Sequence, residues 1–142
     1  MNNNWNYYGV FFNDSNVKRT LLNEANKYVI IPDGWKYYCH HMTIVYNNGT
    51  KEAQAMAEKY EPIVFSPAKL RVEAIGISDR AIAFRVSTDL DIVNKLPHIT
   101  IAVAPGAKPV ESNYITNWKD ITPFYVEGTI QSVKKLREKK YE

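Results

Sequence analysis

The histidines are the residues of this chain best suited to chemistry. Only three occur among the 142 residues, at positions 40, 41 and 98, and two of them begin similar motifs. Residues 41–44 read His-Met-Thr-Ile and residues 98–101 read His-Ile-Thr-Ile. Both motifs lie in apolar stretches typical of strands, where alternate side chains point to opposite faces. Each strand therefore presents an imidazole and a hydroxyl on one face and buries its apolar residues on the other.

We predict that the two strands lie close together, so that four side chains converge on one cleft: His41, Thr43, His98 and Thr100. This set suits the cleavage of a phosphodiester. Because an imidazole titrates near neutral pH, a neutral histidine can take a proton from the attacking oxygen while a protonated one delivers a proton to the leaving oxygen. The threonine hydroxyls can donate hydrogen bonds to the non-bridging phosphate oxygens. Such a mechanism needs no metal or other cofactor.

Two alternatives use residues beside the first motif. The three histidines could hold a metal ion, but strand neighbours point to opposite faces, so His40 and His41 are not expected to share one. Cys39 is in phase with His41 on the predicted strand and would border the same cleft, where its thiol could act as a nucleophile. No Asn or Asp pattern supports that reading. As the only cysteine, Cys39 excludes an intrachain disulfide and a cysteine-rich zinc site.

The motifs belong to an α+β pattern of about six strands and two main helices. The expected strands are residues 7–12, 38–46, 70–77, 81–86, 99–103 and 124–133. The last of them is expected to carry a bulge at Gly128. The expected helical segments are residues 15–28, 51–60 and 109–118, with a helical turn within 90–96.

Composition is that of a single globular domain spanning residues 1–142, with 45% hydrophobic and 23% charged residues. Neither an apolar run of membrane length nor a secretory leader occurs in the sequence, so we expect a cytoplasmic protein without membrane contact. The net charge is +3. We interpret residues 1–6 as a loose N-terminus and residues 134–142 as a basic, solvated C-terminal tail.

The paired motifs resemble the signature of the 2H phosphoesterase superfamily, which is named for two His-x-Thr/Ser elements. The order of a strand at residues 8–12, a helix and then the first motif is similar to that of the superfamily. Residues 98–113 look like the second-motif region of the cyclic phosphodiesterase domains of RNA-repair tRNA ligases. The resemblance covers about residues 7–133. It implies a two-lobed, pseudo-symmetric α+β fold in which antiparallel sheets face a central cleft and helices lie outside.

By this resemblance the chain would be a metal-independent phosphodiesterase that uses the two histidines on an RNA-like cyclic phosphate or a cyclic oligonucleotide. Members of the superfamily act on 2′,3′-cyclic phosphates, 2′-5′ linkages or cyclic oligonucleotide messengers, and its phage members destroy immune messengers. The small Asn- and Tyr-rich chain fits a phage or bacterial source. The alternative function is a binding protein that sequesters a cyclic nucleotide without cleaving it. The expected partner is a small nucleotide or oligonucleotide, without an obligate protein partner.

Residues near the motifs are candidates for substrate binding. Trp35, Tyr38 or Tyr46 could stack on a base, although Tyr46 could equally belong to the core. Lys108 follows the second motif in a loop rich in Pro and Gly, where it would meet a phosphate or stay solvated. The resemblance also places Ser112 and Asn113 near the site. Which linkage is cleaved and which histidine is the acid do not follow from the sequence.

Overall fold

The computed structural model describes residues 4–135, which form one antiparallel sheet with few helices. The strands are β1 (Trp5–Phe11), β2 (Lys36–Tyr37), β3 (His41–Tyr46), β4 (Pro67–Ile77), β5 (Ala81–Ser87), β6 (His98–Val103) and β7 (Trp118–Lys134). The helices within this range are α1 (Ser15–Asn26) and α2 (Lys51–Tyr60). Two short 3-10 turns complete the described elements, η1 (Glu61–Ile63) and η2 (Pro109–Tyr114).

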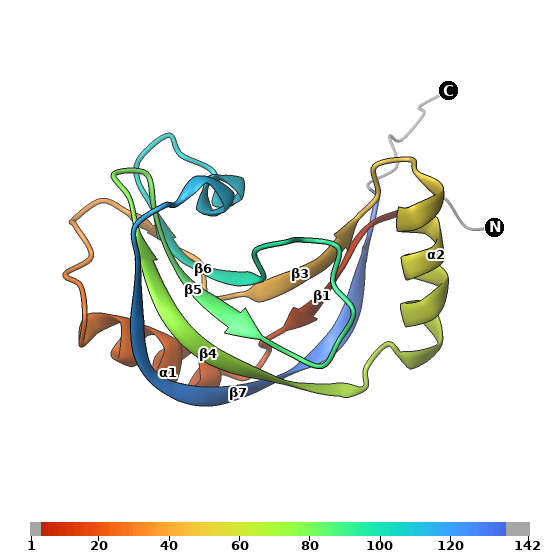
Figure 1. Ribbon diagram of the computed structural model, residues 1–142, viewed down its shortest axis with the longest axis horizontal. Coiled ribbons are helices and arrows are strands. Elements are labelled where there is room, and N and C mark those ends of the chain that lie inside the picture. The colour runs from red at the N-terminus through yellow and green to blue at the C-terminus, as the bar shows by residue number, and fades with distance from the viewer. Residues whose placement is uncertain (1–3, 136–142) are drawn as a thin grey trace, which may run out of the picture.

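The sheet closes on itself. Its strand order is β2-β6-β3-β1-β7-β4-β5, and a further pairing between β5 and β6 joins the ends of a six-strand barrel. The strands β4 and β7 pair along most of their length and carry the sheet unbroken around the curve visible in Figure 1. The two-lobed α+β fold with sheets facing a cleft is therefore wrong, because these long strands cross the point where two lobes would separate.

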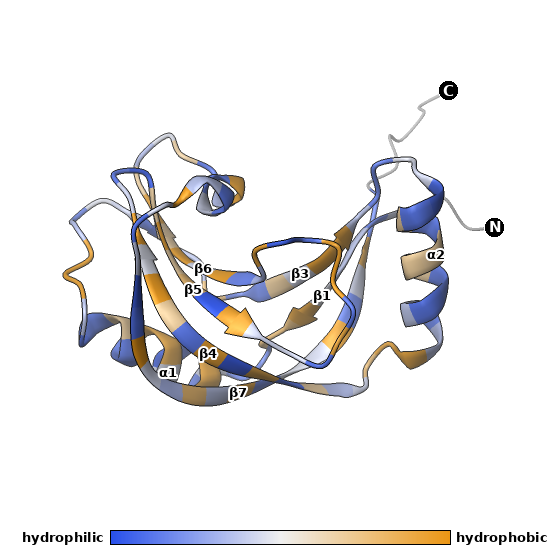
Figure 2. Cartoon of the chain, in the orientation of Figure 1, coloured by the Kyte–Doolittle hydropathy of each residue, from blue (hydrophilic) through white to orange (hydrophobic). Residues whose placement is uncertain are grey.

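The core lies between the sheet and its helices, which pack at opposite sides of the curved sheet in Figure 1. The Asp14 carboxylate caps α1 by accepting from the Asn16 N–H at 2.8 Å, and the Thr50 hydroxyl caps α2 by accepting from the Ala53 N–H at 3.1 Å. Hydrophobic and hydrophilic residues are mixed along the strands (Figure 2). Burial alternates along the first part of β4, whereas β5 and β6 are buried at nearly every position. Across residues 4–135, no helix has the length and apolar character to cross a membrane.

The ends of the chain differ from expectation. Trp5 and Asn6, expected in a loose N-terminus, begin β1, because the Trp5 side chain is buried and its Nε1 donates to Gln54 Oε1 at 3.4 Å. Lys134, expected in the basic tail, ends β7, and the N–H of Lys135 donates to the carbonyl of Asn4 at 2.8 Å. The remainder of the expected tail lies outside the described residues.

Three expected local features also differ. Residues 90–96 form an irregular loop rather than a helical turn, and the helix expected at residues 109–118 is only the short turn η2. That helix ends early because Trp118 already belongs to β7 and pairs with Gly76, where a Cβ would stand 2.5 Å from the Trp118 ring. Gly128 is regularly paired with Ala68 and is not a bulge.

Gly128 is instead a point of close approach between β7 and β1. A Cβ at this position would lie 2.6 Å from the Phe11 carbonyl oxygen and 2.8 Å from Val10 Cγ1. We expect Gly128→Ala to lower the free energy of unfolding by about 1–3 kcal/mol, because backbone must shift to admit the methyl group. Denaturant unfolding checks this. The neighbouring exposed Glu127→Ala is the matched control and should change stability by less than about 0.5 kcal/mol; equal effects of both variants would contradict the packing argument.

Candidate active site

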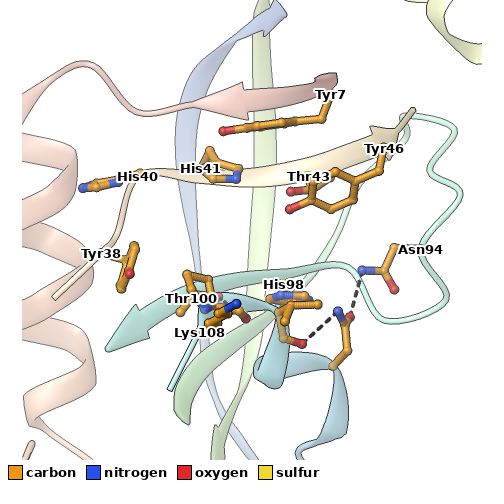
Figure 3. Close-up of a pocket in the computed structure, with 13 residues that line it drawn as sticks. Tyr7, Tyr38, His40, His41, Thr43, Tyr46, Asn94, His98, Thr100 and Lys108 are labelled. Atoms are coloured by element: carbon orange, nitrogen blue, oxygen red, sulfur yellow. Dashed lines mark hydrogen bonds between the residues drawn. The ribbon is translucent and has the colours of Figure 1, made fainter. Parts of the chain in front are cut away.

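A cavity of about 410 Å³ opens where β3 and β6 meet η2 and the loop of residues 88–97. Its lining contains all four motif residues, together with further aromatic and polar side chains. The full set is Tyr7, Tyr38, His40, His41, Thr43, Tyr46, Asn94, His98, Thr100, Lys108, Pro109, Val110 and Asn113. In Figure 3 the side chains from β1 and β3 lie on one side of the cavity and those from β6 and η2 on the other.

One backbone pairing brings the two motifs together. Met42 of β3 pairs with Ile99 of β6, and both side chains are fully buried. Each stands between the histidine and the threonine of its motif, so strand alternation turns those polar side chains to the opposite face. The structure thus places both imidazoles and both hydroxyls in one cavity.

His98 is held by a hydrogen bond to the backbone. Its Nδ1 lies 2.8 Å from the Leu96 carbonyl oxygen, which can only accept, so Nδ1 carries the proton in the neutral ring. The Nε2 lone pair is then free to accept a proton. Burial lowers the pKa of His98, and the Leu96 carbonyl opposes that shift by stabilising the protonated ring.

His41 is held by aromatic packing. Its ring stacks on Phe11 with centroids 4.9 Å apart, and Tyr7 lies at 5.2 Å. Burial, followed by the charges of His40 and His98, lowers the pKa of His41 to about 4. At neutral pH both motif imidazoles are therefore neutral in the free protein. An entering anion would raise both pKa values, because it stabilises the protonated rings.

The two threonines differ in their surroundings. Thr43 is half-buried, whereas Thr100 is buried and its Oγ1 lies 2.8 Å from the hydroxyl of Ser112 and 3.4 Å from the Pro109 carbonyl oxygen. Ser112 itself is fully buried in η2. When Ser112 donates to Thr100, the Thr100 hydroxyl donates to the Pro109 carbonyl over a long contact of 3.4 Å, a bond weak enough to be exchanged for one to a ligand in the cavity.

Lysine and tyrosine side chains surround the motif residues. Lys108 is exposed at the start of η2, where its N–H donates to Glu111 Oε2 at 2.7 Å. The rings of Tyr7 and Tyr46 lie 5.3 Å apart on paired positions of β1 and β3. Tyr38 lies under the ammonium of Lys36 at 5.2 Å. The exposed Tyr46 side chain thus contributes to the cavity wall rather than to the core.

The segment before the first motif departs from the predicted strand. Residues 38–40 are not part of β3, and Cys39 has a positive φ of 59°. This turn breaks the alternation, so Cys39 points into the core and not toward the cavity, and burial raises the pKa of its thiol to about 12. His40, expected on the opposite face, reaches the edge of the cavity. Trp35 lies outside the lining, because its half-buried ring packs against the core.

Several lining residues were not identified from the sequence. Tyr7 lines the cavity because its strand, β1, pairs with β3. The spacing of the motifs does not reveal this long-range pairing. Asn94, in the loop of residues 88–97, also lines the cavity, and its side-chain N–H donates to Asn113 Oδ1 at 3.0 Å. The Asn-rich composition gives no local signal for this contact. Only the β-branched and aromatic character of residues 7–12 could have marked Tyr7 as a strand residue near the site.

The comparisons with known proteins agree with this geometry. The sequence matches the family model described as "Fungal tRNA ligase phosphodiesterase domain" over residues 15–138. No curated protein matches the sequence significantly. The fold is similar to that in "Crystal Structure of Fungal RNA Kinase", with a TM-score of 0.60 and 16% sequence identity, covering 94% of this chain and 45% of that one.

The two comparisons carry different weight. At 16% identity the structural likeness concerns the fold, and this chain spans less than half of that protein. The family model, in contrast, matches most of the sequence, including both His-x-Thr motifs. The chain therefore belongs to the fungal tRNA ligase phosphodiesterase domain family, which is of the 2H phosphoesterase type.

Proposed function

We propose that this protein is a metal-independent phosphodiesterase that opens the 2′,3′-cyclic phosphate of an RNA-like nucleotide with two histidines. The observation that carries the proposal is the shared cavity of His41 and His98, in which the Leu96 carbonyl leaves Nε2 of His98 free. Membership of a phosphodiesterase domain family supports the reaction class. The alternative, a binding protein that only sequesters the nucleotide, would share the cavity but release no product.

The proposed reaction divides proton transfer between the two imidazoles. A water molecule attacks the phosphorus, and the neutral imidazole of His41, whose pKa is strongly lowered, takes its proton as the new P–O bond forms. The bond from phosphorus to one ribose oxygen breaks. Nε2 of His98, protonated once the anion has entered and stabilised in that form by the Leu96 carbonyl, gives that oxygen a proton. Thr43 and Thr100 donate hydrogen bonds to the non-bridging oxygens, whose charge grows in the transition state. Lys108 is placed to attract the anion.

The first test removes each imidazole. We expect His41→Ala and His98→Ala each to lower kcat by about 10²–10⁴-fold on a 2′,3′-cyclic mononucleotide, measured with excess EDTA. The double variant should be little worse than the single ones, because one proton transfer is useless without the other. Circular dichroism checks the fold of each variant. Multiplicative losses, or wild-type turnover that EDTA abolishes, would contradict the two-histidine mechanism.

The second test uses pH. Because burial lowers the pKa of both histidines in the free protein, the bell-shaped profile of kcat/KM should have its maximum below pH 6.5. The kcat profile should lie at higher pH, since the bound anion raises both pKa values. His40→Ala should move the acidic limb of kcat/KM upward, because His40 lowers the pKa of His41. A maximum above pH 8, or an acidic limb unchanged in His40→Ala, would argue against the assignment.

The third test asks whether Ser112 acts through Thr100. Thr100→Val should cost about 1.5–3 kcal/mol in kcat/KM, the worth of a hydrogen bond to a charged group. Ser112→Ala should lower kcat/KM about fivefold, as loss of one neutral hydrogen bond would. If Ser112 orients the Thr100 hydroxyl, its substitution should have no further effect in the Thr100→Val background. Thr43→Val is the matched background: there Ser112→Ala should still lower kcat/KM about fivefold. If Ser112→Ala lowered kcat/KM equally in the Thr43→Val and Thr100→Val backgrounds, Ser112 would only support the fold.

A further inference from the structure

A second cavity of about 510 Å³ adjoins the first. It is bounded by the end of β3, the loop of residues 88–97 and η2. Five residues line both cavities: Thr43, Tyr46, Asn94, Val110 and Asn113. The two cavities therefore adjoin across these residues, and we refer to them together as the groove. A cyclic mononucleotide needs only the first part, so the second is room for more substrate.

The walls of the second cavity suit a nucleobase. Three of its side chains are unusually exposed for apolar or aromatic residues, with 52% of Tyr46, 40% of Val93 and 50% of Val110 open to solvent. Tyr46 comes from β3, Val93 from the loop and Val110 from η2, so the apolar surface surrounds the cavity on three sides. Stacking of a base on such a ring is favourable for any base, because every base has a π-face.

Hydrogen bonds hold the walls of the second cavity in a fixed geometry, which favours ligand binding. Several contacts tie down the loop of residues 88–97. Beside the cavity, the Val93 N–H donates to the Ile44 carbonyl at 3.2 Å and the Asn94 side chain donates to Asn113 Oδ1. Farther along the loop, the Tyr60 hydroxyl donates to the Asp91 carbonyl at 2.7 Å. Asn113 in turn donates to the Val110 carbonyl at 3.1 Å. These contacts hold Val93 and Val110 in place before any ligand arrives, which reduces the entropy lost on binding.

Charge along the groove matches a chain of phosphates. Neither set of lining residues contains a carboxylate, and each contains one lysine, Lys108 in the first cavity and Lys95 in the second. Lys95 makes no ion pair with any of the residues 4–135. An exposed, unpaired ammonium in a groove without acids attracts an anion. The two lysines thus supply one cation for each of two consecutive phosphates.

Resting on the phosphodiesterase function proposed above, we propose that the second cavity is the subsite for the nucleotide that precedes the one carrying the reacting cyclic phosphate. Tyr46 and Val93 hold its base, and Lys95 holds the phosphate that joins it to the rest of the substrate. The preferred substrate is then an oligonucleotide of at least two residues. A lone cyclic mononucleotide is a poorer substrate because it leaves this subsite empty.

The test compares 2′,3′-cyclic AMP with the dinucleotide ApA that ends in the same cyclic phosphate. The reacting bond is identical, so the ratio of the two kcat/KM values reports the subsite alone. We expect the dinucleotide to be favoured about 5- to 150-fold, the range expected for stacking one base. Lys95→Gln and Val93→Asp should each bring the ratio toward one, and added salt should do the same for wild type.

Lys69→Gln is the matched control, because Lys69 lies over the Tyr125 ring on β4, outside both cavities. It should keep the wild-type ratio. A wild-type ratio near one, or a ratio that survives both Lys95→Gln and Val93→Asp in folded protein, would overturn the subsite while leaving the phosphodiesterase function intact. Absence of turnover on both substrates would instead overturn the phosphodiesterase function itself. The same variants assayed on a cyclic dinucleotide show whether the subsite also accepts a closed substrate.

Discussion

The site depends on a single backbone pairing, that of Met42 in β3 with Ile99 in β6. Both side chains are fully buried, and each stands between the histidine and threonine of its motif. A slip of either strand by one residue would bury an imidazole and a hydroxyl and expose an apolar side chain. The apolar residues of the two motifs therefore do as much for the site as the polar ones, because their burial fixes which face the polar ones occupy.

The packing that fixes the histidines also controls their charge. Stacking on Phe11 orients His41 but removes it from water, so the pKa of His41 falls to about 4. His98 is partly buried too, and this lowers its pKa, yet its hydrogen bond to the Leu96 carbonyl favours the protonated ring and opposes the shift. The two imidazoles are thus unequal before any ligand arrives. Such an inequality suits the proposed division of roles, in which one imidazole acts as base and the other as acid.

Local sequence pattern was sufficient for the motif strands but not for the way the sheet closes. The repeated His-x-Thr frame placed four side chains on one face because strand alternation is a local rule. The barrel depends on β5 pairing with β6 and on β7 continuing past β1 to β4, and long-range registers of this kind leave no periodic trace. The positive φ of Cys39 was equally invisible, since this conformation is uncommon for residues other than glycine. It moved His40 to the cavity edge and Cys39 into the core.

The charge beside the first cavity depends on how one neighbouring carboxylate, that of Glu111, is paired. Glu111 lies in η2 only three residues after Lys108, close enough to neutralise an anion site. Arg80 instead holds both oxygens of Glu111, with Nε at 2.8 Å and Nη2 at 3.2 Å, and lowers its pKa. The pair is exposed and adds little to stability. Its effect is on the field: the Arg80 guanidinium balances the charge of the Glu111 carboxylate, which also accepts from the Lys108 N–H, so that carboxylate offsets less of the positive charge beside the cavity. The positive charge of the two cavities therefore depends on the arrangement of a few side chains more than on the modest net charge of the chain.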